Sequence, residues 1–216
     1  MDWTNLFREN GNEEESIKMK KYMKDNFEFL GLRSPLRKEL QKDFFKSISK
    51  EGSLDRNMVK MLWDQKEREY QYVAIDYLIK KKGDLEREDI SFIKKLIVTK
   101  SWWDTVDLIA SYLVGEILEK YPDLVDEYIR CWYKDENMWL RRAALLYQLK
   151  YKEKLNTEIL EEAIKYNIND KEFFIRKAIG WALREYSKVN KEWVKKFISN
   201  NPELSTLSIR EGSKYL

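Results

Sequence analysis

The chain has 216 residues, 43% of them hydrophobic and 14% aromatic, which excludes a disordered chain. Its single cysteine, Cys131, excludes disulfides within the chain and any thiolate metal cluster. The lack of histidine excludes Ser-His-Asp and Cys-His nucleophile pairs and the usual zinc site. The 41 basic and 38 acidic residues nearly balance, so net charge neither supports nor excludes a polyanionic partner. Any enzymatic chemistry therefore rests on carboxylates, lysine, tyrosine or electrostatics.

The N-terminal segment and the hydropathy pattern indicate where in the cell the protein is expected. Residues 1–5 contain no basic region followed by an apolar run, and no stretch approaches about eighteen apolar residues. We therefore expect a cytoplasmic protein with no membrane partner, and a monomer.

Helical periodicity covers almost the whole chain, and no segment shows the alternation of a strand. Only three prolines and seven glycines interrupt it, and no linker is long enough to separate domains. The sequence therefore predicts an all-α protein with a single domain over residues 1–216. The predicted helices are 14–27, 34–48, 56–66, 67–82, 87–98, 101–120, 124–133, 136–151, 157–166, 171–187, 191–199 and a short one after Pro202.

An internal repeat appears in the second helix of each successive pair. Each of these helices has an aromatic residue and a second residue four positions further on. This second residue is small in three of the four helices. These second residues are separated by 33, 36 and 35 positions, an interval that suits a HEAT or armadillo solenoid although it is somewhat shorter than the usual period. The four pairs are Tyr70 and Ala74, Trp103 and Asp107, Trp139 and Ala143, and Phe174 and Ala178.

One repeat departs from this pattern, because Asp107 stands where the other three have alanine. On a helix Asp107 shares a face with Trp103, while Ser101 is expected to cap the helix together with Asp104. Two interpretations remain open from the residues alone. Asp107 is either a structural carboxylate, for example one paired with Arg142, or a functional one. The tryptophans at helical spacing likewise fit a core as well as a ligand platform.

Three segments of this repeat resemble the DNA alkylation repair glycosylases of the AlkD type. They are Trp-Trp-Asp-Thr-Val-Asp at 102–107, Trp-Leu-Arg-Arg-Ala-Ala at 139–144, and the segment 173–186, which contains Trp181. Residues 22–35 are similar to that family's N-terminal helices, though less specifically. The resemblance covers nearly the whole chain. It implies a right-handed solenoid of stacked helical pairs whose concave, basic face holds duplex DNA.

The resemblance also implies roles for particular residues. Asp107 matches the catalytic carboxylate, and Trp103 and Trp181 match two indoles that flank the damaged nucleotide. Arg142 matches a contact to a backbone phosphate, although Arg141 beside it is an alternative for that contact. Two further matches are Tyr22, an aromatic residue near the lesion, and Arg184, a second phosphate contact.

The activity that the resemblance implies is hydrolysis of the N-glycosidic bond of cationic alkylated purines, chiefly N3-methyladenine and N7-methylguanine, in duplex DNA. The residue chemistry agrees with it, because a cationic base leaves without a general acid and one carboxylate can stabilise the sugar cation. The reaction needs no cofactor and no metal. Two alternatives stay open: a non-catalytic relative that binds distorted or branched DNA, and a protein-interaction solenoid that has no basic concavity.

Overall fold

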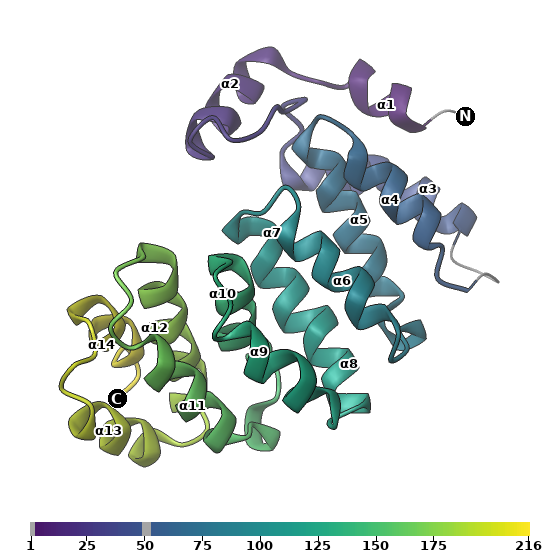
Figure 1. Ribbon diagram of the computed structural model, residues 1–216. Helices are drawn as coiled ribbons and strands as arrows, with labels where there is room; N and C mark the ends of the chain where they lie inside the picture. The colour runs from purple at the N-terminus through teal and green to yellow at the C-terminus, as the bar shows by residue number, and fades with distance from the viewer. Residues whose placement is uncertain (1–2, 49–52) are drawn as a thin grey trace. The chain divides into compact units, whose positions relative to one another are not determined.

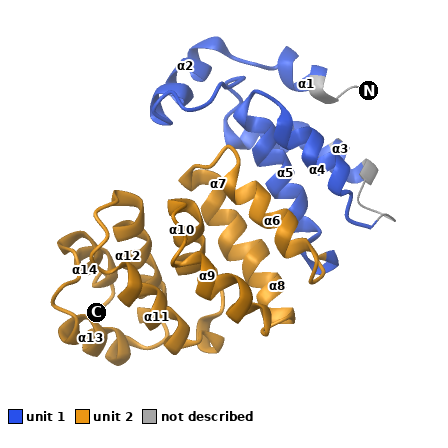
Figure 2. Ribbon diagram, viewed as in Figure 1, with its two compact units in different colours: residues 1–84 blue, residues 85–216 orange. Residues whose placement is uncertain are grey.

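The computed structural model describes residues 3–48 and 53–216 (Figure 1). Contacts divide the chain, which the sequence predicts as one domain, into two compact units, residues 1–84 and 85–216 (Figure 2). Every named element in the described residues is helical, and the β-bridge between Glu28 and Glu67 lies outside any strand. The predicted all-α class is confirmed for this part of the chain.

The first unit contains short helices joined by capped turns. Asn12 caps α2 by accepting a hydrogen bond from the Glu15 amide, and Asp55 caps α4 in the same manner. The predicted helix over 14–27 ends early, because Lys24 and Asp25 have φ values of 57° and 59°. Helix α1 was not predicted. The elements are α1 (Trp3–Glu9), α2 (Glu13–Tyr22), α3 (Ser34–Ile48), α4 (Arg56–Asp64), α5 (Arg68–Lys80) and a 3-10 turn (Lys82–Asp84).

The loop between α2 and α3 is fastened to the start of α5. The buried carboxylate of Glu69 accepts hydrogen bonds from the backbone amides of Leu30, Gly31 and Leu32, at 2.9 to 3.1 Å. Gly31 has a φ of 84°, and a Cβ there would lie 2.0 Å from a backbone oxygen, so only glycine fits. The guanidinium of Arg68 lies 3.8 Å from the Phe27 ring centroid. These contacts hold the segment that follows Tyr22 in place within this unit.

The second unit repeats a helix, turn and helix pattern. Two stretches wind as π-helix, and one of them directly follows α7. The helix predicted over 136–151 ends earlier, at Leu146. The elements are α6 (Asp89–Val98), α7 (Trp103–Leu108), a π-helix (Ile109–Val114), α8 (Gly115–Lys120), a π-helix (Val125–Ile129), α9 (Arg130–Trp132), α10 (Met138–Leu146), a 3-10 turn (Lys152–Lys154), α11 (Thr157–Asn167), α12 (Phe173–Ser187), α13 (Lys191–Asn200) and α14 (Thr206–Gly212).

The second helices of successive pairs form one layer of this unit. Helix α10 packs against α7 and against α12, and α12 packs against α14 (Figure 1). The first helices pack on this layer, as α11 does on α10 and α13 does on α12. Aliphatic side chains of the second helices are buried, among them Val106, Ile109, Leu140, Ile175 and Leu183.

Polar contacts between neighbouring pairs follow the sequence interval of the repeat. The Tyr151 hydroxyl donates to the Gly115 carbonyl, 36 residues away. The Lys120 ammonium donates to the Leu85 carbonyl, 35 residues away, and the Asn167 amide to the Tyr133 carbonyl, 34 residues away. These separations agree with the interval of 33 to 36 residues read from the sequence, so the repeat corresponds to a structural unit.

None of the helices in the described residues is both long enough and apolar enough to cross a lipid bilayer.

Candidate active site

The predicted catalytic carboxylate forms an ion pair with arginine. Asp107 on α7 accepts from Arg142 on α10 at both oxygens: Nε donates to Oδ1 and Nη2 to Oδ2, each at 2.7 Å. The Arg142 side chain is 2% exposed, whereas that of Asp107 is 14% exposed. The two hydrogen bonds form a bidentate pair. Because Asp107 is the more exposed partner, a ligand reaches Asp107 before it reaches Arg142.

The protonation of Asp107 is set by two opposing effects. Burial raises the pKa of the Asp107 carboxyl above its ordinary value, because an ionised carboxylate loses hydration there. Hydrogen bonds from Arg142 oppose that rise, and the charge of nearby Asp104 adds to it. The site therefore contains a carboxylate that takes up a proton more readily than an exposed aspartate, but whose ionised form has a fixed cationic partner.

Arg142 also binds α12, so three helices meet at its guanidinium. Its Nη1 donates to the backbone carbonyl of Phe174, and its Cζ lies 5.8 Å from the Phe174 ring centroid. The same Cζ lies 5.7 Å from the ring centroid of Trp181, one of the predicted indoles. Asp107, Arg142 and Trp181 are thus joined in one chain of contacts.

Two guanidinium groups, those of Arg142 and Arg184, lie close to the Trp181 ring. Arg184, three residues further along α12, has its Cζ 5.4 Å from the Trp181 ring centroid. The indole Nε1 of Trp181 is buried without a hydrogen-bond acceptor. An electron-rich indole face attracts cations, which here are supplied by Arg142 and Arg184. The same face is suited to a cationic sugar or base.

Trp103 and Trp102 begin α7 and differ in their surroundings. Trp103 is the first residue of α7, half-buried, one helical turn before Asp107. Trp102 packs in a cluster with Trp139 and Phe174, with ring centroids 5.6 and 5.1 Å from its own. Its indole nitrogen is buried and lacks an acceptor. Of the two interpretations left open for the tryptophans, this ring packing favours a core role for Trp102.

The start and end of α7 explain how Asp107 is presented. The prediction that Ser101 caps this helix is wrong, because its hydroxyl donates to the Ile97 carbonyl of α6 at 2.6 Å, and Trp102 occupies the cap position without a side-chain bond. After Leu108 the chain winds as π-helix, and the Ser111 hydroxyl donates to the Asp107 carbonyl at 2.7 Å. A π-helical turn carries an extra residue, which is common at functional sites.

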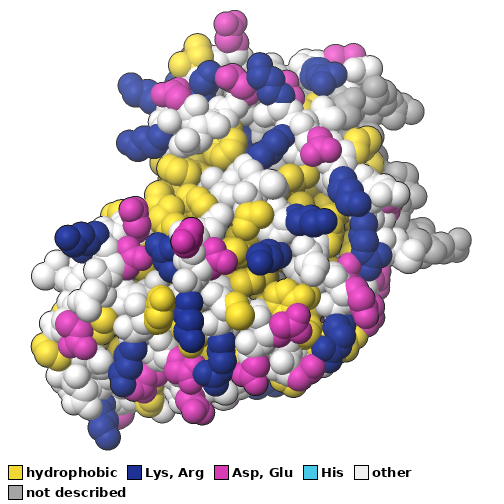
Figure 3. Space-filling model, in the orientation of Figure 1, with side chains coloured by type: hydrophobic (Ala, Val, Ile, Leu, Met, Phe, Trp, Pro, Cys, Tyr) yellow, Lys and Arg dark blue, Asp and Glu magenta, His cyan; other side chains and the backbone are white. Residues whose placement is uncertain are grey.

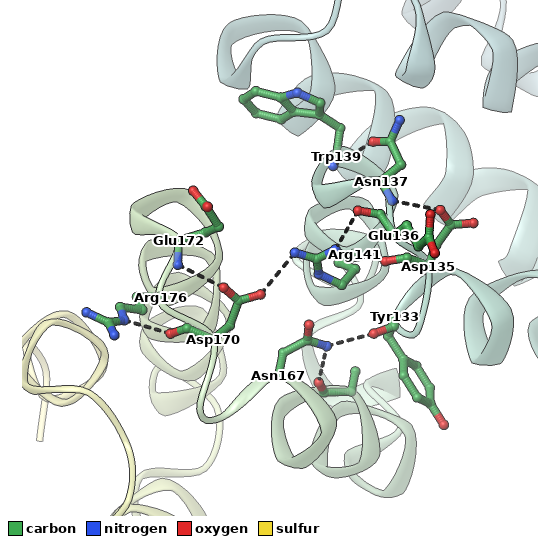
Figure 4. A network of polar contacts seen from close by, with 11 residues as sticks. Tyr133, Asp135, Glu136, Asn137, Trp139, Arg141, Asn167, Asp170, Glu172 and Arg176 are labelled. Carbon is green, nitrogen blue, oxygen red and sulfur yellow. Dashed lines mark hydrogen bonds and ion pairs between the residues drawn. The ribbon is translucent and has the colours of Figure 1, made fainter.

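Arg141, the alternative phosphate contact, is also occupied within the protein (Figure 4). Its Nη1 donates to the carbonyls of Asp135 and Glu136, at 2.8 and 2.9 Å, and its Nη2 to the Asp170 carboxylate at 3.0 Å. Asp170 in turn accepts from the Glu172 amide at 2.8 Å. Arg141 therefore fastens the turn before α10 to the turn before α12.

The structure thus brings some of the predicted site residues together. Asp107, Arg142, Trp181 and Arg184 are linked by direct contacts, and Trp103 lies on the helix of Asp107. Tyr22 belongs to the other unit, where it is the last residue of α2 and 68% exposed. Arg142 binds Asp107 rather than facing solvent, as the structural interpretation of Asp107 anticipates. The contact of Arg142 with a backbone phosphate stays a prediction.

Sequence reasoning did not single out two participants. The Phe174 carbonyl is a backbone group and carries no residue signal. Glu211 on α14, which binds Arg184, lies in a short helix without a motif, and its separation of 27 residues from Arg184 does not match the repeat interval.

Charge is mixed over one face of the second unit. On the face shown in Figure 3, Lys and Arg side chains alternate with Asp and Glu and do not gather into one basic stripe. Such a mixed face does not by itself attract a polyanion.

The fold and the carboxylate, guanidinium and indole contacts can be compared with known proteins. The sequence profile of the family described as DNA alkylation repair enzyme matches residues 4–216, and the chain belongs to that family. It is similar to a solved structure from Enterococcus faecalis described as a predicted DNA alkylation repair enzyme, with 38% identity, a TM-score of 0.88, and coverage of 95% of this chain and 96% of that one.

A second solved structure, that of smu.31 from Streptococcus mutans UA159, shares the fold. It has 19% identity and a TM-score of 0.62, with 94% of this chain and 99% of that chain covered. None of the curated proteins matches the sequence.

Proposed function

We propose that the protein is a DNA glycosylase that hydrolyses the N-glycosidic bond of cationic alkylated purines, N3-methyladenine and N7-methylguanine, in duplex DNA. It acts as a cytoplasmic monomer without cofactor or metal. Membership of the DNA alkylation repair family supports a DNA substrate. The observation that carries the reaction type is the Asp107 carboxylate, which is paired with Arg142 and in contact through it with the Trp181 indole.

The chemistry needs little more than these groups. An alkylated purine is already positively charged, so when the C1′–N bond breaks the base takes the electron pair and leaves as a neutral molecule. The sugar becomes an oxocarbenium ion, which Asp107 stabilises by its negative charge. Water adds to C1′ and its proton passes to the carboxylate and then to solvent. Indole faces contribute about 0.5 to 2 kcal/mol each to holding a cation.

The layer of α7, α10, α12 and α14 supports the further proposal that the helical pairs stack as a right-handed, HEAT-like solenoid. In such a solenoid the second helices line the concave face, and DNA is held mainly through its phosphates. The contacts that link Asp107 to Arg142, Arg142 to Trp181 and Trp181 to Arg184 lie on three helices of this layer. Trp103 is proposed to approach the lesion from this face, and Tyr22 is proposed to contact DNA from its own unit.

One observation favours a second candidate, a non-catalytic protein that binds distorted or branched DNA. Both oxygens of Asp107 are bound by Arg142, as in a purely structural ion pair. The two candidates differ in whether a base is released.

The test is release of 7-methylguanine from methylated duplex DNA in the presence of a chelator. We expect release by the wild type, and loss of most of it in Asp107→Asn with DNA binding retained. A folded wild-type protein that binds DNA and releases no base supports the second candidate. Full activity of Asp107→Asn contradicts the catalytic role of this carboxylate.

A further inference from the structure

We propose that Lys177, Arg184 and Lys214, held together by Glu211, form a binding site for the phosphodiester backbone of duplex DNA beside Trp181. The proposal rests on the DNA substrate proposed above and assigns a part of its binding surface. Arg184 was singled out from the sequence, whereas Lys177, Lys214 and Glu211 were not.

Glu211 is the centre of a cluster of cations. Its Oε1 lies 2.8 Å from the Lys177 ammonium, and its Oε2 lies 2.7 Å from that of Lys214 and 3.3 Å from Nη1 of Arg184. The Glu211 side chain is 5% exposed, while that of Lys214 is 46% exposed. The carboxylate is therefore inside the cluster, and the cations lie between it and solvent.

The cluster carries an excess of positive charge. Arg184 also lies 4.0 Å from Glu185, and Glu185 binds Lys188 at 2.7 Å. The four cations and two carboxylates of this group leave a formal charge of +2. Two unit charges about 4 Å apart repel by about 1 kcal/mol even in water, so an added anion stabilises the group. A DNA backbone supplies regularly spaced anions of this kind.

The two helices that carry the cluster are closely packed. A Cβ on Gly180 of α12 would lie 2.6 Å from the Glu211 Cβ and 3.0 Å from the Ser208 carbonyl oxygen. The Ser208 hydroxyl donates to the Arg176 carbonyl of α12 at 2.9 Å. This close packing of α12 and α14 fixes the backbone positions of Lys177, Arg184 and Glu211, which lowers the ordering cost of binding.

The cluster also adjoins the candidate active site. Arg184 contacts the Trp181 ring, whose other guanidinium neighbour is Arg142, the partner of Asp107. A phosphate bound by Arg184 would therefore lie within two side chains of the catalytic carboxylate.

Glu211 has a second effect in this arrangement, since it competes with phosphates for the same cations. Hydrogen bonds from Lys177 and then Lys214 lower the pKa of Glu211 to about 2, so it is ionised whenever DNA binds. Removal of its charge frees the cations. Glu211 thus limits the affinity of the site for DNA.

The experiment measures binding to undamaged duplex DNA as a function of salt concentration. Each phosphate contact contributes about 0.9 to the slope of log K against log salt. We expect the double variant Lys177→Gln/Lys214→Gln to reduce the slope by about 1.8. The matched control is Lys165→Gln on α11, which removes an equally charged side chain from an ion pair with Glu161 and should leave the slope unchanged.

The variant Glu211→Gln is expected to change the affinity for DNA and the salt slope in the opposite direction. We expect tighter binding at low salt and a slope steeper by up to about 0.9, because one competing charge is lost. If a folded Glu211→Gln binds DNA less tightly, the cluster is only a fastening between α12 and α14. If Glu211→Gln unfolds, the test is the salt dependence of DNA binding by the single variant Lys214→Gln, which changes an exposed side chain. An unchanged slope in Lys214→Gln overturns the proposal.

Release of 7-methylguanine is measured with the same proteins, which separates this proposal from the glycosylase activity. No release, together with the expected slopes, contradicts the reaction and leaves the phosphate site standing. Normal release with slopes equal to the wild type contradicts the phosphate site alone. A wild-type protein that binds no DNA contradicts both.

Discussion

Arg142 donates to both carboxylate oxygens of Asp107 at 2.7 Å, from a helix 35 residues further along the chain. The repeat places the two residues on adjacent second helices, so the repeat interval itself brings the pair together. A structural ion pair and a catalytic carboxylate share this geometry.

The Asp107 and Arg142 pair should stabilise the fold mainly by mutual compensation. We expect Arg142→Gln to lower the free energy of unfolding by about 3 kcal/mol, because it leaves a mostly buried carboxylate without its cation. The double variant Asp107→Asn/Arg142→Gln should cost less than the sum of the single changes, by about 1 to 3 kcal/mol. Urea unfolding measures all three, and strict additivity would contradict the coupling.

The pH dependence of base release should follow the raised pKa of Asp107. Since the ionised carboxylate is the active form, the single-turnover rate should fall on the acid side at a pH above the usual aspartate value of about 3.9. Arg142→Gln should move this acid limb to higher pH, because the hydrogen bonds that oppose the rise are lost. An acid limb that stays in place in Arg142→Gln would show that another group titrates.

The same raised pKa has a consequence for stability with a definite sign. The folded state holds the Asp107 proton more tightly than the unfolded state does. This contribution to stability is therefore fully present below the unfolded pKa and is lost as pH rises through the folded pKa. Comparison of unfolding in wild type and Asp107→Asn across that range checks it, since the asparagine cannot titrate. Parallel curves would contradict the shift.

The close approach of α12 to α14 should be sensitive to one methyl group. We expect Gly180→Ala to lower stability by about 1 to 3 kcal/mol, because the new Cβ would overlap Glu211 and Ser208. Gly83→Ala is the matched control, since a Cβ there meets nothing within 4 Å. Thermal unfolding measures both. Equal effects of the two substitutions would mean that α14 shifts away without cost.

Much of the helical architecture can be predicted from local signals. Caps such as Asn12 and Asp55, and the period of the apolar residues, determine helices whatever surrounds them. The first helix was missed because its few residues give too short a window for periodicity. The cap at Ser101 was predicted wrongly because its hydroxyl had a competing acceptor at Ile97, which sequence spacing does not reveal.

The sequence by itself determined the all-α class, the repeat interval and the exceptional position of Asp107, because each depends on spacing along the chain. Only the tertiary structure decided that Arg142 binds Asp107, that two guanidinium groups lie close to the Trp181 ring, and that Glu211 binds three cations. The contact of Arg142 with Asp107 joins residues 35 positions apart, and that of Arg184 with Glu211 joins residues 27 positions apart. Which charged residues of neighbouring helices form a pair depends on how closely the helices pack. Gly180, for example, allows the close approach of α12 and α14.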